Sequence, residues 1–147
     1  MATIQLPPDF KEFLKLLNSN SVEYLVIGGY AVNYFGFPRA TADLDIWIAI
    51  GPDNAQRITE ALHSFGFAQA DAAWFQQERK IIRMGVPPLR LEILTTISGV
   101  EFADCYSRRL EAELDGVTMN FIQLDDLKRN KRASGRLKDQ VDLEQLP

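Results

Sequence analysis

Two aspartates separated by one residue, Asp43 and Asp45, are the side chains of this chain best placed to do chemistry together. The run that holds them, Asp-Leu-Asp-Ile-Trp-Ile, alternates as a β-strand does. Both carboxylates therefore point to one face, with their Cα atoms about 6–7 Å apart. Carboxylate oxygens at this spacing suit a hard divalent cation such as Mg²⁺. A solvated acidic face is an equally good interpretation of this pattern alone.

A third acid, Glu92, lies in a later apolar run at residues 89–94. Its phase is opposite to that of Leu91 and Ile93, so its side chain leaves the apolar face of that predicted strand. If the two strands are neighbours, three carboxylates converge and repel one another unless cations lie between them. Such a cluster would hold two Mg²⁺ ions, or Mn²⁺ in their place, about 3.5–4 Å apart. The alternative is three surface acids.

A glycine pair precedes the aspartates. Gly28 and Gly29 follow a four-residue apolar strand and open a helix, where bare backbone and free N–H groups can approach a phosphate. Such pairs mostly serve turns, but the position ahead of two acids favours phosphate binding. Arg39 could bind phosphate with two parallel hydrogen bonds, and Thr41 could bond the loop or a nucleotide. A solvated loop charge and a turn hydroxyl are the alternatives.

Basic residues crowd into positions 128–138 of this otherwise acidic chain. They are Lys128, Arg129, Lys131, Arg132, Arg136 and Lys138. Aspartates flank the segment, so a helical face laced with ion pairs is one interpretation. A positive wall that neutralises a triphosphate or an RNA strand is the other. The pattern alone slightly favours the first.

Several helices and strands must position these groups. Apolar periodicity predicts strands at 24–27, 43–50, 81–84, 89–94 and 117–122. It predicts helices near 9–17, 29–35, 53–65, 102–108 and 125–146, the last one divided near Ser134-Gly135, and a short helix near 72–77. Interleaved helices and strands indicate an α/β or α+β fold with a small mixed sheet flanked by helices. The order of the strands in that sheet stays open.

Length and composition are typical of a globular protein. The 147 residues suit one domain, with a core over about 22–123 and a C-terminal helical segment over 124–147. No apolar run is long enough to span a membrane, and a lone Cys105 fits a reducing cytoplasm. The net charge of -4 argues against general nucleic-acid binding but leaves room for a local basic patch.

The order strand, Gly28-Gly29, helix, Asp43-x-Asp45 and a later acid resembles the nucleotidyltransferase superfamily, whose fold is shared with DNA polymerase β. Within it, the run from Arg39 to Asp45 is similar to small bacterial AbiEii/AbiGii toxin-like proteins and to antibiotic adenylyltransferases. The resemblance covers residues 24–48, 89–94 and 124–146. The chain departs from it at Gly29, where many relatives have serine, and in its short length.

This resemblance implies a metal-dependent transfer of a nucleoside monophosphate from a nucleoside triphosphate to an acceptor hydroxyl. Asp43, Asp45 and Glu92 would then be catalytic and hold the Mg²⁺ ions. The C-terminal segment resembles the family's Lys…Arg…Asp…Asp-Leu motif, which lies beside the nucleotide. It therefore adds nucleotide-binding roles for further residues, namely Lys131, Arg136, Lys138 and Asp139.

The acceptor and the partners stay open at the level of sequence. A tRNA end, a small hydroxylated compound such as an antibiotic, and a protein side chain are all candidate acceptors. A second class of function is a nucleotide-binding module without catalysis, acting in a toxin–antitoxin or regulatory pair, as an oligomer or with a cognate protein. A third is an α/β scaffold whose acids are adjacent by chance.

Overall fold

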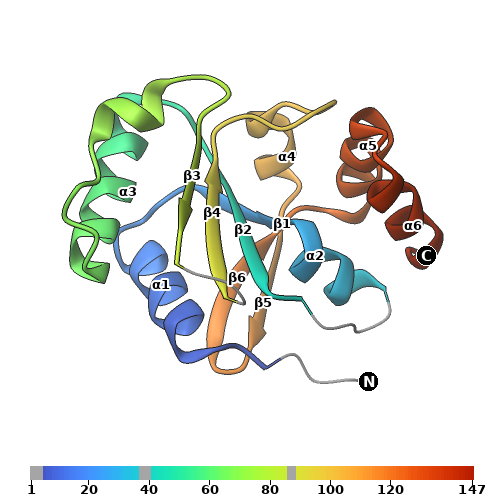
Figure 1. Ribbon diagram of the computed structural model, residues 1–147, viewed down its shortest axis with the longest axis horizontal. Helices are drawn as coiled ribbons and strands as arrows, with labels where there is room; N and C mark the ends of the chain where they lie inside the picture. Colours follow the sequence, from blue (N-terminus) through green and yellow to red (C-terminus); the bar gives the residue numbers. More distant parts are fainter. Residues whose placement is uncertain (1–4, 37–40, 86–88) are drawn as a thin grey trace.

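A computed structural model describes residues 5–36, 41–85 and 89–147 of the chain (Figure 1). The helices are α1 (Pro8–Ser19), α2 (Gly28–Phe35), α3 (Pro52–Phe65), α4 (Phe102–Ser107), α5 (Leu124–Ser134), α6 (Leu137–Gln145) and the 3₁₀ helix η1 (Ala72–Gln76). The strands are β1 (Tyr24–Ile27), β2 (Asp43–Ile48), β3 (Ile81–Met84), β4 (Arg90–Leu94), β5 (Leu110–Leu114) and β6 (Val117–Phe121). No helix in the described ranges has the length and apolar character needed to span a bilayer.

The six strands form one mixed sheet in the order β3-β4-β2-β1-β6-β5. β2 runs parallel to β4 and β1 runs parallel to β6, while the other neighbouring pairs are antiparallel. The prediction of an α/β fold with a mixed sheet flanked by helices is therefore confirmed. β2 and β4, the strands that carry the three acids, are direct neighbours.

The two faces of β2 have different surroundings because its side chains alternate. Leu44, Ile46 and Ile48 are fully buried on one face. On the other face, the Trp47 ring packs edge-on against Phe102 of α4, with ring centroids 5.0 Å apart. Its indole N–H donates to the carbonyl of Thr95 at 3.3 Å. α4 therefore contacts the far part of the face that carries Asp43 and Asp45.

A strand that the sequence analysis did not predict, β5, pairs with β6 at the edge of the sheet. The turn between them contains Asp115 and Gly116, both with left-handed φ angles of 50° and 78°. Such angles are typical of the two-residue turns that join antiparallel strands. Most of β5 is exposed, and its Leu-Glu-Ala-Glu-Leu sequence has none of the β-branched residues that signal a strand.

The C-terminal segment forms two helices, as predicted from Ser134-Gly135. Gly135 ends α5 in the left-handed conformation, with a φ of 66°, and α6 begins two residues later. Figure 1 shows α5 and α6 together at one side of the molecule, beyond α2. Gly36, at the end of α2, lies against the carbonyl of Gln145 of α6, where a Cβ atom would be only 2.8 Å from that oxygen. Position 36 therefore has no room for a side chain where the end of α2 meets the end of α6.

Candidate active site

The parallel register of β2 and β4 sets Asp45 directly beside Glu92, and Asp43 beside Arg90. Because neighbouring residues in register point to the same face, all three predicted acids lie on one face of two adjacent strands. The strand order that the sequence left open is thus the one that brings these carboxylates together.

Asp45 is the most perturbed of the three acids. Burial raises its pKa to about 7, assisted by a hydrogen bond to Glu92 and by the charges of Glu92 and Asp43, and opposed by Lys138. Its Oδ1 atom is buried and has no hydrogen-bond partner among the described residues. A buried carboxylate oxygen without a donor is costly, and a bound cation or proton removes that cost.

The pKa of Glu92 moves the other way. Burial alone would raise it, but hydrogen bonds from Asp45 and Arg83 and the charge of Arg83 lower it. The Arg83 guanidinium lies 2.5 Å from Glu92 Oε1. The raised pKa of Asp45 and the lowered pKa of Glu92 therefore favour Asp45 as the protonated partner of this pair.

Asp43 is paired with an arginine as well. Arg90 donates to its two carboxylate oxygens over 3.4 and 3.3 Å. Both side chains are about one-third exposed.

Within the described parts of the chain, no three His, Cys, Asp or Glu side chains stand in an arrangement that could hold a metal ion. The outer acids instead bond to Arg90 and Arg83, which the sequence analysis did not place in the site.

The stability of the protein is expected to fall as pH rises from about 4 to 7, because folded Asp45 keeps a proton that the unfolded chain releases. We expect a loss of about 1–2 kcal/mol between pH 5 and 8, with a lower melting temperature at the higher pH. The lowered pKa of Glu92 acts below this window. Thermal unfolding across pH checks this, and Asp45→Asn should flatten the profile. An unchanged slope in that variant would contradict the assignment.

The glycine pair begins α2 directly beside Asp45. Gly28 has a left-handed φ of 67°, and a Cβ atom there would lie 2.1 Å from Asp45 Oδ2. Among the described residues, no side chain caps the N-terminus of α2. At Gly29 a Cβ atom would lie 2.5 Å from the Thr41 hydroxyl, so Thr41 fills the space that a side chain at position 29 would need. Arg39 lies outside the described residues.

Gly28→Ala is expected to displace Asp45 as well as strain the backbone. The strain of a left-handed alanine costs about 1–2 kcal/mol, and the overlap with Asp45 adds to it. Gly116→Ala is the matched control, because Gly116 has a similar φ of 78° and nothing within 4 Å of the added atom. Denaturant unfolding should show the larger loss for Gly28→Ala. Equal losses in the two variants would show that Gly28 does not constrain Asp45.

Two basic residues of the C-terminal motif act electrostatically on the acids. The charge of Lys138 lowers the pKa of Asp45. The pKa of Arg136 is raised, first by its hydrogen bond to Asp139 and in smaller part by the charge of Asp45. Both basic side chains are exposed. The start of α6 therefore places positive charge near the acids, in the exposed positions a polyanion could reach.

Lys131, which the family resemblance predicts to bind nucleotide, lies in a buried cluster of charges. Its ammonium group lies 3.0 Å from carboxylate oxygens of both Asp139 and Asp142, and all three side chains are buried. Asp139 also accepts hydrogen bonds from Ser134 and Arg136. Lys131 therefore joins α5 to α6 from inside, while Arg136 and Lys138 lie at the surface.

Comparison with known proteins finds likeness at the level of structure. No protein-family model and no curated protein matches the sequence. A crystal structure from Thermotoga maritima, of a protein provisionally designated a nucleotidyltransferase, superposes with a TM-score of 0.62 at 14% identity, over 95% of this chain and 93% of that one. The chain has a nucleotidyltransferase-like fold. An antigenic nucleotidyltransferase-like protein from Paracoccidioides brasiliensis superposes with a TM-score of 0.55 at 17% identity, over 92% and 71%.

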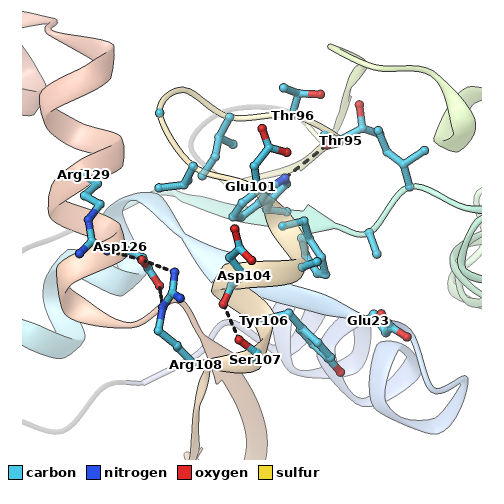
Figure 2. A pocket seen from close by; sticks show the side chains of 18 of the residues that line it. Glu23, Thr95, Thr96, Glu101, Asp104, Tyr106, Ser107, Arg108, Asp126 and Arg129 are labelled. Carbon is cyan, nitrogen blue, oxygen red and sulfur yellow. Dashed lines mark hydrogen bonds and ion pairs between the residues drawn. The ribbon is translucent and has the colours of Figure 1, made fainter.

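The nucleotidyltransferase-like fold of this chain also contains a large cavity, of about 1380 Å³, away from the acids. Trp47, Ala49 and Ile50 line it, so it lies at the opposite end of β2 from Asp43. Figure 2 shows Arg108 and Arg129 both reaching Asp126, at 3.0 and 2.7 Å. None of the three predicted acids lines this cavity. The perturbed carboxylates and the glycine turn mark the acid face as the better candidate.

Proposed function

We propose that this protein is a metal-dependent nucleotidyltransferase, which moves a nucleoside monophosphate from a nucleoside triphosphate to an acceptor hydroxyl. One observation carries the proposal: Asp45 lies in register with Glu92 and against Gly28, with one oxygen buried and without a partner among the described residues. Electron-rich oxygens beside an uncapped helix start suit a cation and a phosphate together. The nucleotidyltransferase-like fold is consistent with this chemistry.

The acids fit a divalent cation by their chemistry. Asp45 and Glu92 offer adjacent carboxylates, and Asp43 lies two residues from Asp45 on the same face. These three residues would hold the metal once Asp43 and Glu92 leave their arginine partners. Two Mg²⁺ ions, or Mn²⁺ in their place, would supply charge neutralisation at the triphosphate and at the departing pyrophosphate.

The residues of the chain would then perform the following roles. The Gly28 and Gly29 amides bind phosphate oxygens, and the Thr41 hydroxyl is positioned to assist where Gly29 has no side chain. Arg136 and Lys138 bind the triphosphate from the start of α6. Arg39 is a further candidate from the sequence.

The transfer itself is an in-line displacement. The acceptor oxygen attacks the α-phosphorus, the bond from that phosphorus to the bridging oxygen breaks, and pyrophosphate leaves. Glu92 accepts the proton of the acceptor hydroxyl. Most of the rate enhancement comes from position and charge stabilisation.

The proposal is tested by measuring pyrophosphate release from ATP, CTP, GTP and UTP with Mg²⁺. Total tRNA, hydroxylated antibiotics and the protein itself serve as acceptors in separate reactions, and labelled nucleotide identifies the product. Release that requires Mg²⁺ and an acceptor supports the proposal. Absence of both release and nucleotide-dependent thermal stabilisation would overturn it, since a ligand at a hundredfold excess over Kd stabilises by about 2.7 kcal/mol.

A nucleotide-binding module without catalysis is the second candidate. The pairing of Asp43 with Arg90 and of Glu92 with Arg83 favours it, because both acids already have cationic partners. Such a module, in a toxin–antitoxin or other regulatory pair, would bind nucleotide and shift in melting temperature but release no pyrophosphate. The same experiment therefore separates the two candidates.

A further inference from the structure

Two arginines lie among the three acids on the same face of the sheet. Arg90 of β4 is in register with Asp43 of β2, and Arg83 of β3 is in register with Glu92 of β4. Each arginine thus lies beside one acid of the neighbouring strand. Asp45 and Glu92 form the one adjacent pair of acids in this set.

We propose that Arg83 and Arg90 are phosphate-binding residues that the acids hold until a divalent cation replaces the guanidinium groups. This inference rests on the proposed function and adds the class of group that these side chains recognise, the triphosphate. In the unloaded site each guanidinium neutralises one carboxylate. In the loaded site the carboxylates bind the cation and the guanidinium groups bind phosphate oxygens.

The contacts of Arg90 suit such an exchange. Its two hydrogen bonds to Asp43, at 3.4 and 3.3 Å, are long for charged partners, and the side chain is 39% exposed. Charged hydrogen bonds of full strength are about 2.7–2.9 Å long. Exposed pairs of this kind separate readily. A guanidinium has five N–H donors. Asp43 accepts hydrogen bonds only from the Nε and Nη2 groups of Arg90, so this side chain has further donors for a second acceptor.

Arg83 lies on β3, beside Glu92, and is still more exposed, at 60% of its side chain. Its contact with Glu92 Oε1 is short, so we expect it to exchange less readily than Arg90. Arg83 lies beside Glu92 on the neighbouring strand, and Arg90 lies two residues before Glu92 on β4, so both guanidinium groups are next to the acids on the β3–β4 side of β2. A planar guanidinium at such a position can donate two parallel hydrogen bonds to phosphate oxygens. An ammonium group attracts phosphate only as a point charge.

The test uses Arg90→Gln in the full chain with two probes, manganese chloride alone and manganese tripolyphosphate. Loss of the competing guanidinium should tighten Mn²⁺ binding, followed by electron paramagnetic resonance of the free ion, by about threefold. Loss of a phosphate ligand should weaken manganese tripolyphosphate binding, followed by calorimetry, by at least about tenfold. Opposite shifts for the two probes are the expected result.

Two further variants sharpen this result. Arg90→Lys keeps the positive charge but loses the planar guanidinium. Its Mn²⁺ affinity should therefore stay near that of the wild type, while its affinity for manganese tripolyphosphate should be reduced as in Arg90→Gln. Arg57→Gln on α3, a helix that packs against α1 and η1, removes the same charge elsewhere and should change neither affinity by more than about twofold. Circular dichroism and melting temperature confirm that each variant is folded.

The outcomes distinguish this inference from the proposed function. If Asp45→Asn abolishes Mn²⁺ binding but Arg90→Gln behaves like Arg57→Gln, or shifts both affinities in one direction, the arginine exchange is wrong and the metal site stands. If Asp45→Asn leaves Mn²⁺ binding unchanged, the proposed function fails and the arginine exchange fails with it.

Discussion

Asp45→Asn is expected to reduce metal-dependent pyrophosphate release by at least about 10³-fold, because it removes the carboxylate at the centre of the acid face. The same change should stabilise the folded protein at pH 8 by about 1–2 kcal/mol, since the amide has no charge to bury. For a chain of this length that corresponds to a rise of about 3–6 °C in melting temperature. Steady-state pyrophosphate assays and thermal unfolding measure the two effects.

Opposite changes in activity and stability separate a functional role for Asp45 from simple damage to the fold. Asp53→Asn, at an exposed position in the first turn of α3, is the control and should leave turnover and melting temperature close to those of the wild type. Wild-type turnover in Asp45→Asn would refute the assignment of Asp45. A loss of both activity and stability would mean that this carboxylate serves mainly to hold the fold.

The second large effect is expected at Lys131. Lys131→Ala removes the buried ammonium group that lies 3.0 Å from both Asp139 and Asp142 and neutralises part of their charge. Removing one partner of a buried ion pair costs about 3–5 kcal/mol. We therefore expect a loss of that size in urea unfolding. Hydrogen exchange should rise first in α6, because the cluster joins that helix to α5.

Arg132→Ala is the matched control for Lys131. Arg132 is the next residue of α5 and is exposed, so its loss removes the same charge at a cost of less than about 0.5 kcal/mol. Lys131→Ala should also weaken nucleotide binding, because Arg136 and Lys138 depend on the position of α6. Equal unfolding free energies in the two variants would contradict the structural role of the cluster, and would favour a surface role for Lys131.

Alternation within single strands predicted much of the candidate site. Asp43 and Asp45 had to share a face of any strand that included them, and Glu92 had to oppose Leu91 and Ile93. The pairing of β2 with β4 was not predictable, because strand order depends on packing between segments far apart in the chain. The ion pairs of Asp43 with Arg90 and of Glu92 with Arg83 follow from that order and were missed with it. The sequence contained one sign of these ion pairs, since Arg90 and Glu92 have the same phase and so leave the same face of their strand.

β5 shows a different limit. Its Leu-Glu-Ala-Glu-Leu sequence is rich in helix-favouring residues, and only pairing with β6 makes it a strand. The Asp115-Gly116 turn was the available signal, because this dipeptide between apolar runs is typical of a hairpin. At Lys131 the composition was informative but ambiguous. Sequence alone could not decide which basic residues of the segment are buried beside Asp139 and which remain at the surface.

The parallel pairing of β2 with β4 has a consequence for how the site forms during folding. Asp43 and Arg90 are 47 positions apart, and α3, η1 and β3 all lie between them. Closing so long a loop costs chain entropy, and pairings of such high sequence separation slow folding. A nascent or partly unfolded chain therefore has the glycine turn and the first two acids without their partners from β4. Only the completed sheet brings the groups together.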